Sequence, residues 1–271
     1  MGISVFYENI HDGALAAGIP TEELLEKLRD AGMESIYCSA ESWERDRAFL
    51  PGMLKRLGLR VSGMHAFCDF PGDPESLRYR EIIDEAVESG ADNLLFVPGM
   101  LSGGNTVRDL ERMTEGMRRA VAYGRTAGMP VLMEDYDGLL APYNCMAGLK
   151  NFLDSVEGLE CAFDTGNFIM FHEDELAAFD LFCGTIRAVH LKDRSPAARH
   201  EGDTPCVCAD GRKAFACAVG SGEIRMAEIL RRLRERGYQG NLIIELYACD
   251  SRYFLRDALD SLRWVREQTG N

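Results

Sequence analysis

The chain has 271 residues with ordinary hydrophobic (46%) and charged (27%) fractions, enough for a sizeable core and at most two domains. Its net charge of −14, from 30 Lys and Arg against 44 Asp and Glu, argues against nucleic acid or an anionic membrane as a partner, because no general cationic field attracts phosphates. No long apolar run predicts a membrane span, and the N-terminal MGISVFYENI lacks the basic region of a secretory signal. The 9 cysteines, an odd number without a CxxC pair, favour a reducing cytoplasm.

Short apolar runs alternate with longer amphipathic stretches along the whole chain, which predicts strands followed by helices. The predicted strands are residues 3–8, 35–40, 60–67, 93–99, 130–135, 159–164, 186–192 and 241–246. The clearest predicted helices are residues 20–32, 106–128, 225–240 and 251–268. The first of these begins with Pro20 and Thr21, carries glutamates in its first turn and ends at Gly32, as helix caps and the helix dipole favour.

Eight strand–helix units in a chain of this length predict an α/β protein with a (β/α)₈ TIM barrel, a fold of typically about 250 residues. No linker interrupts the pattern, so residues 1–271 are expected to form one domain. An open, doubly wound sheet is the alternative, but the segment NIHDGALAAG after the first strand lacks its Gly-rich phosphate loop. Residues 194–222 predict a long, irregular insertion, and insertions of that length are often functional or mobile.

Four successive predicted strands end in a side chain capable of chemistry. These are Glu134 (beside Asp135), Asp164, His190 and Glu245. The active site of such a barrel lies at the carboxyl ends of its strands, so these side chains are expected at one rim. Each alone could be a solvated strand end or a helix cap, but three buried carboxylates together repel one another unless a cation offsets them. The donor set suits one Mn²⁺, Mg²⁺, Co²⁺ or Zn²⁺ ion with positions left for substrate oxygens.

These motifs resemble those of the xylose isomerase-like TIM-barrel superfamily, and within it the sugar-phosphate isomerase/epimerase group. The resemblance is carried by EDY (134–136), FDTGNF (163–168), VHLKD (189–193) and VGSGEI (219–224), with Glu245 completing the set. The sequence departs from the pattern at Tyr136 and Asn167, where many members have His. The AP endonucleases of the superfamily need more histidines than these, which together with the acidic charge argues against DNA repair.

The resemblance implies that Glu134, Asp164, His190 and Glu245 hold one divalent metal ion. In the related ketose 3-epimerases two metal-bound glutamates move the proton through a metal-stabilised enediolate, which implies catalytic roles for Glu134 and Glu245. The implied function is a metal-dependent isomerase or epimerase of a sugar, sugar phosphate or related polyol. A dehydratase of the inosose type and a non-catalytic sugar-binding barrel are the alternatives. Barrels of this group often form homo-oligomers.

Further side chains at the predicted rim are candidates for contact with a small carbohydrate substrate. They are Glu8, Trp43, His65, Asn167, Lys192 and Arg194. A His on the third strand often contacts substrate in the resembled family, and an amide at position 167 can hold a substrate hydroxyl. Each also has a plain structural interpretation, such as a rim ion pair or, for Trp43, packing. We expect the other histidines, His11, His172 and His200, at the surface.

Overall fold

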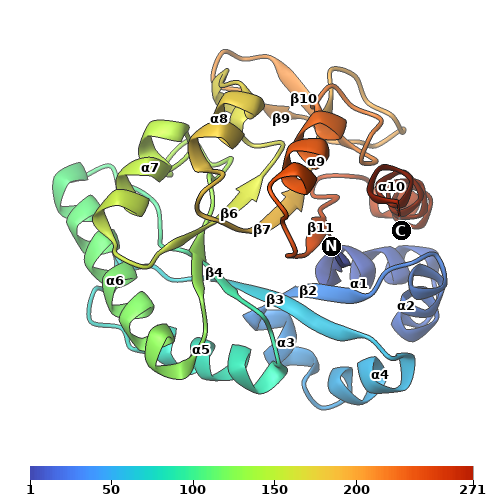
Figure 1. Ribbon diagram of the computed structural model, residues 1–271, viewed down its shortest axis with the longest axis horizontal. Helices are drawn as coiled ribbons and strands as arrows, with labels where there is room; N and C mark the ends of the chain where they lie inside the picture. Colours follow the sequence, from blue (N-terminus) through green and yellow to red (C-terminus); the bar gives the residue numbers. More distant parts are fainter. Residues whose placement is uncertain (271) are drawn as a thin grey trace.

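Eight parallel strands close into a barrel in the computed structural model, which describes residues 1–270 (Figure 1). Around the barrel the order is β1-β11-β7-β6-β5-β4-β3-β2, and β1 pairs in parallel with both β11 and β2. The strands are β1 (Ile3–Phe6), β2 (Ser35–Ser39), β3 (Arg60–Phe67), β4 (Leu94–Val97), β5 (Val131–Met133), β6 (Glu160–Asp164), β7 (Ile186–Leu191) and β11 (Leu242–Ile244). The predicted (β/α)₈ barrel is therefore confirmed.

Helices surround the barrel (Figure 1). They are α1 (Tyr7–Ala17), α2 (Thr21–Asp30), α3 (Ala40–Asp46), α4 (Leu50–Leu57), α5 (Arg78–Ser89), α6 (Thr106–Ala127), α7 (Met146–Ser155), α8 (Glu175–Phe182), α9 (Met226–Glu235) and α10 (Phe254–Thr269), with the 3₁₀ helices η1 (Phe168–Phe171) and η2 (Ser251–Tyr253). The last helix, α10, packs against α1, α2 and α9 and so closes the ring beside the first helix.

Helix α6 illustrates how local sequence sets these elements. The side chain of Asn105 accepts a hydrogen bond from the backbone N–H of Arg108 and caps the helix, and Gly128 ends it in a left-handed conformation. Its buried face includes Met113, Met117, Ala120 and Val121, which recur at helical spacing and pack into the core.

The first strand is shorter than the sequence predicts. It ends at Phe6, and Tyr7 begins α1, so Glu8 lies in the first turn of a helix instead of at a strand end. The hydroxyl of buried Tyr7 donates a hydrogen bond to Asp46 Oδ2 at 2.9 Å, which ties the start of α1 to α3. This contact between elements distant in sequence leaves no periodic signal that a strand-length estimate can detect.

The insertion is more regular than the sequence predicts. Strands β8 (Asp193–Ser195), β9 (Cys206–Val207) and β10 (Lys213–Cys217) form a small antiparallel sheet in the order β8-β10-β9. The expectation of an irregular segment is therefore wrong for this part of the chain. Strands of two to five residues are too short to show a clear alternation of apolar and polar residues.

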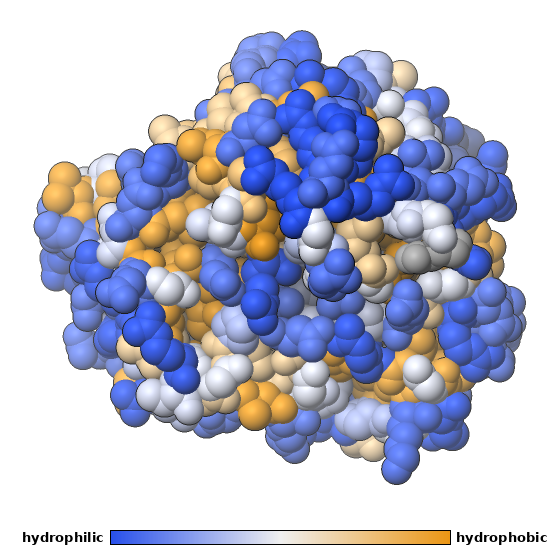
Figure 2. Space-filling view, in the orientation of Figure 1, coloured by the Kyte–Doolittle hydropathy of each residue, from blue (hydrophilic) through white to orange (hydrophobic). Residues whose placement is uncertain are grey.

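The surface of the molecule is mostly hydrophilic on the face that can be seen in Figure 2. Hydrophilic side chains cover most of the face shown in Figure 2, and hydrophobic ones show between them in separate patches. The large buried core instead spans the strands and the inner faces of the helices. Among the helices of residues 1–270, none combines the length and apolarity that crossing a bilayer requires.

Candidate active site at the carboxyl ends of the strands

Three predicted metal ligands converge at one rim of the barrel. Glu134 directly follows β5, Asp164 is the last residue of β6, and His190 lies in β7 next to Asp164 in the strand register. One ligand atom from each lies within 4.8 Å of the others, and all three residues are buried. Among residues 1–270 this is the group of His, Cys, Asp and Glu side chains with the spacing of a metal site.

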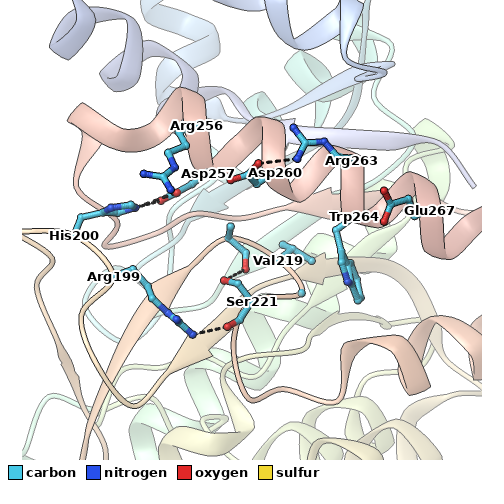
Figure 3. A pocket seen from close by; sticks show the side chains of 12 residues that line it. Arg199, His200, Val219, Ser221, Arg256, Asp257, Asp260, Arg263, Trp264 and Glu267 are labelled. Carbon is cyan, nitrogen blue, oxygen red and sulfur yellow. Dashed lines mark hydrogen bonds and ion pairs between the residues drawn. The ribbon is translucent and has the colours of Figure 1, made fainter.

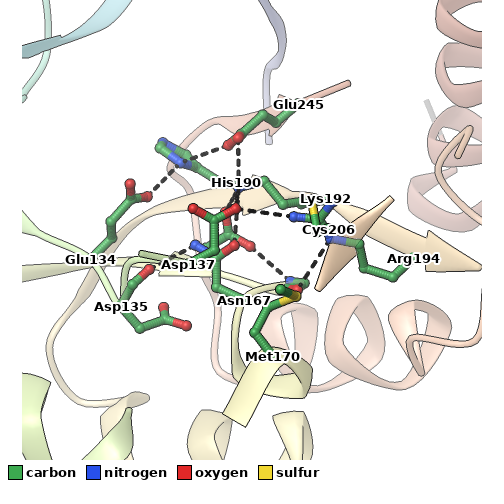
Figure 4. Close-up of polar contacts among 12 residues, drawn as sticks. Glu134, Asp135, Asp137, Asn167, Met170, His190, Lys192, Arg194, Cys206 and Glu245 are labelled. Atoms are coloured by element: carbon green, nitrogen blue, oxygen red, sulfur yellow. Dashed lines mark hydrogen bonds and ion pairs between the residues drawn. The ribbon is translucent and has the colours of Figure 1, made fainter. Parts of the chain in front are cut away.

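The imidazole of His190 is the centre of the cluster. Its Nδ1 atom lies 3.0 Å from Glu134 Oε2 and 3.4 Å from Glu245 Oε2, and Figure 4 shows the two glutamates on either side of the ring. Nevertheless neither Glu134 Oε2 nor His190 Nδ1 has a well-directed hydrogen bond, although both atoms are buried. Buried polar atoms without such partners are rare, and a cation between them would satisfy both. The donor set therefore fits a divalent metal ion.

Lys192 holds the fourth predicted ligand. Its Nζ atom lies 2.6 Å from Glu245 Oε1 and 3.0 Å from Asp164 Oδ2, and it donates a hydrogen bond to Asn167 Oδ1 at 3.0 Å. Asn167 is itself fixed, because its Nδ2 donates to the backbone oxygen of Asp135 at 2.7 Å. The ammonium therefore bridges the carboxylate that ends β6 and the one that follows β11, and Asn167 positions it there.

The charges of this cluster depend on one another. Burial alone would lower the pKa of His190, but Glu134 and Glu245 raise this pKa to about 10. Burial raises the pKa of Asp164 to about 7, although Lys192 opposes the rise. Burial also disfavours the charged forms of Lys192 and Glu245. Nevertheless the neighbouring carboxylates raise the pKa of Lys192 above its usual range, and Lys192 and His190 lower the pKa of Glu245 below its usual range. Positive charge on His190 and Lys192 thus offsets the buried carboxylates.

A second basic residue, Arg194, lies behind this cluster and not in it. Its side chain is fully buried, and Nη2 donates to Asp137 Oδ2 at 3.2 Å while Nη1 lies 3.3 Å from Cys206 Sγ of the insertion. Asp137 is a site residue that the sequence reasoning missed. The available signal was its position three residues after Glu134, in the loop that leaves the rim.

A cavity of about 350 Å³ opens onto the cluster. Its lining includes the polar residues Glu8, Asn9, Glu41, His65, Glu134, Asp137, His190, Lys192 and Glu245 and the apolar or aromatic residues Phe6, Phe67, Leu95, Val97, Tyr136 and Tyr247. Of the predicted substrate contacts, Glu8, His65 and Lys192 reach this cavity. Asn167 and Arg194 lie behind its wall, and Trp43, 5% exposed, packs in the core. The aromatic residues of the lining were not predicted.

Glu8, at the start of α1, and His65, in β3, lie on another wall of the cavity. Glu8 Oε1 accepts a hydrogen bond from the backbone N–H of Ser39 at 2.8 Å, whereas its Oε2 is buried without a partner. Burial raises the pKa of Glu8, but His65 and the Ser39 N–H more than offset this and lower it overall. The His65 ring stacks on Tyr37, with centroids 5.8 Å apart, and its Nδ1 is buried without a partner. Both side chains therefore offer free polar atoms near the cavity.

A larger cavity of about 610 Å³ lies elsewhere, between the insertion and α10 (Figure 3). His200 Nε2 lies 2.9 Å from Asp257 Oδ2 there, and the His200 ring stacks on Tyr253 at 4.1 Å between centroids. The side chain of His200 is only 11% exposed, so its expected surface position is wrong, because α10 covers the insertion at this point. This cavity is away from the strand ends and has no metal-ligand cluster among residues 1–270. The smaller cavity is therefore the candidate active site.

The protein is a (β/α)₈ barrel. Its set of potential metal ligands lies at the carboxyl ends of the strands, where enzymes with this fold carry their active sites. A model of the xylose isomerase-like TIM barrel family matches residues 50–268. The chain belongs to that family.

Individual relatives are more distant. An inosose dehydratase from Lacticaseibacillus casei is 24% identical over 137 residues, which make up 50% of this chain and 46% of that protein. The match therefore spans about half the length of this curated relative.

Similar solved structures cover almost the whole chain. The probable 3-DHS dehydratase AsbF from Bacillus anthracis has a TM-score of 0.73 at 14% identity, covering 97% of this chain and 99% of that one. An L-ribulose 3-epimerase has a TM-score of 0.73 at 17% identity, covering 100% and 95%. A D-psicose 3-epimerase has a TM-score of 0.72 at 12% identity, covering 100% of both chains. At these identities the likeness establishes the shared fold.

Proposed function

We propose that the protein is a divalent-metal-dependent isomerase or epimerase of a sugar, sugar phosphate or related polyol. The observation that carries the proposal is the position of Glu134 and Glu245, whose carboxylates approach His190 Nδ1 at 3.0 and 3.4 Å and line the same cavity. Two carboxylates facing one substrate can take a proton from carbon and return it, the exchange that isomerisation and epimerisation both need.

Glu134, Asp164 and His190 would hold the metal ion, with Glu245 as the fourth ligand. A divalent cation supplies Lewis acidity, which polarises a substrate carbonyl and acidifies the neighbouring C–H bond. The buried Glu134 Oε2 and His190 Nδ1 atoms support this assignment, because neither has a well-directed hydrogen-bond partner within the protein.

The remaining steps belong to the chain's own side chains. Lys192 and His190 keep Glu245 ionised, so its carboxylate can accept a proton. Glu134 lies on the other side of His190 and would return the proton from its own side of the substrate. Glu8 and His65, whose side chains line the opposite wall of the cavity, would bind substrate hydroxyls.

The test combines metal analysis of the native protein with a mass-spectrometric screen of ketoses, with and without phosphate, in D₂O. Proton transfer through a carbon acid predicts one solvent deuterium in the product and one bound metal ion per chain. A protein that binds no divalent metal, or a product free of deuterium, would contradict this mechanism.

A dehydratase is the second candidate, and the position of Lys192 favours it. Its buried ammonium lies between Asp164 and Glu245 and lines the cavity, where its positive charge and N–H groups would stabilise a departing hydroxyl. The match to an inosose dehydratase is in keeping with this chemistry. Incubation with inososes separates the candidates, because a dehydratase yields a product lighter by one water and an epimerase yields an isomer of equal mass.

A further inference from the structure

The glycine-rich turn between β7 and β11 holds a carboxylate of the chain itself. Asp193 Oδ2 accepts hydrogen bonds from the backbone N–H groups of Gly220 at 2.8 Å and Gly222 at 2.9 Å. Its Oδ1 accepts from the N–H of Arg194 at 2.9 Å and of Ile224 at 3.3 Å. The side chain is almost completely buried, and a Cβ added at Gly222 would lie 2.1 Å from Oδ1. These four N–H groups form a closed anion nest that Asp193 fills.

The place of this nest matters for substrate choice. In (β/α)₈ barrels that act on phosphorylated compounds, backbone N–H groups of the loops after the seventh and eighth strands commonly bind the phosphate. Glycine-rich turns suit this role because their N–H groups can converge on one anion. Here the turn at residues 219–224 follows the seventh barrel strand, and its converging N–H groups are already satisfied by Asp193.

The charges that line the cavity also disfavour a phosphate group. Five carboxylates line it, and they come from both walls: Glu8, Glu41, Glu134, Asp137 and Glu245. The ammonium of Lys192 is already shared between Glu245 and Asp164. The guanidinium of Arg194 does not line the cavity, because it is buried behind the wall, where it donates to Asp137. No arginine lines this cavity among residues 1–270, so outside the proposed metal site a phosphate would face carboxylates and no unpaired basic side chain.

We infer that the substrate is an uncharged polyhydroxy carbonyl compound and that its phosphorylated counterpart is excluded. This inference rests on the proposed function and narrows its substrate class. Carboxylates accept hydrogen bonds from hydroxyl groups, and Glu8 and Glu41 line the cavity outside the ligand cluster. Phe6, Phe67 and Val97 supply an apolar surface suited to the C–H side of such a molecule.

The first experiment is isothermal titration of the protein, saturated with Mg²⁺, with D-fructose, D-fructose 6-phosphate and inorganic phosphate. Titration of each ligand into the same buffer without protein is the blank. We expect the ketose to bind at least about tenfold more tightly than its phosphate, and inorganic phosphate to bind more weakly than about 1 mM. Equal or tighter binding of the ketose phosphate, or tighter binding of inorganic phosphate, would overturn the inference.

The inorganic phosphate measurement keeps this inference separate from the proposed function. If no ketose binds or reacts in a broad screen, the proposed function fails. Inorganic phosphate still reports on the cavity in that case, because its binding needs no correct guess of the carbon skeleton. Weak binding of inorganic phosphate then supports the inference that the cavity excludes phosphorylated compounds, and tight binding contradicts it.

Two Glu→Lys variants test whether the carboxylates of the cavity are what excludes the phosphate. Glu41 and Glu44 lie on the same short helix, α3, but only Glu41 lines the cavity. Glu41→Lys should strengthen binding of ketose phosphate at least about fivefold, whereas Glu44→Lys, with the same change in net charge, should leave it within about twofold. An equal effect of both variants, or none from Glu41→Lys, would show that the cavity carboxylates do not exclude the phosphate.

Discussion

Lys192 Nζ lies 2.6 Å from Glu245 Oε1, the shortest ion pair of the candidate site, and the same ammonium lies 3.0 Å from Asp164 Oδ2. Lys192 therefore forms ion pairs with two of the four side chains that are expected to hold a metal ion. The ammonium and a divalent cation repel each other and compete for the same oxygens. This competition makes the metal affinity depend on a residue that is not itself a ligand.

Replacement of Lys192 by Gln should tighten metal binding while it slows turnover. The amide removes the competing charge from Asp164 and Glu245, and a gain of about tenfold in Mn²⁺ affinity, about 1.4 kcal/mol, is expected. Titration calorimetry measures the affinity. Lys150→Gln is the matched control, since Lys150 forms an exposed pair with Asp154 on α7. Unchanged or weaker Mn²⁺ binding in Lys192→Gln would show that the ammonium does not compete.

Glu134→Gln and Glu245→Gln should each lower kcat by about 10²- to 10⁴-fold, because either substitution removes one of the two groups that move the proton. The fold should survive, since both side chains line a cavity and do not fill the core. Activity and thermal unfolding are to be measured together, with Glu115→Gln as the control, because the Glu115 side chain is exposed on α6. Near-normal turnover in either variant would remove that glutamate from the mechanism.

Metal binding should release protons at neutral pH. In the metal-free protein the pKa of His190 is raised to about 10, and that of Asp164 to about 7. Both residues must give up their protons to bind a metal ion, so affinity should rise as the pH increases from about 6 to about 8. Calorimetry in buffers of different ionisation enthalpy measures the protons released, expected to be about one to two per ion. Affinity that falls with rising pH would contradict this charge assignment.

Gly222→Ala should destabilise the protein by about 1–3 kcal/mol, because the added methyl group enters the space of the Asp193 carboxylate. Denaturant unfolding measures the loss. Gly104→Ala is the control, since the nearest atom to its added Cβ is 3.5 Å away. If the two variants unfold at the same denaturant concentration, the carboxylate is not held tightly in its nest.

Several parts of the fold and site could be predicted from the sequence because they depend on local patterns. The eight strands showed as apolar runs that alternate with amphipathic stretches, and β3 (Arg60–Phe67) begins and ends where predicted. Once the barrel is assumed, the positions of Glu134, Asp164 and His190 at one rim follow, since parallel strands bring their carboxyl ends together.

Other features depend on contacts between segments far apart in the chain. Asp193 and Arg194 are neighbours in sequence, yet one fills the nest of residues 219–224 and the other is buried against Asp137. The regular sheet of the insertion also forms only through pairing between short, separate strands.

The sequence by itself determined the barrel and the residue types at its rim, because hydrophobic periodicity and strand spacing are local properties. Only the tertiary structure decided which charges meet. It placed Lys192 between Asp164 and Glu245 and closed the glycine-rich turn around Asp193. Which charged side chains pair depends on the distances between strands and loops across the barrel. These distances are set by the tertiary structure and leave no pattern in the sequence.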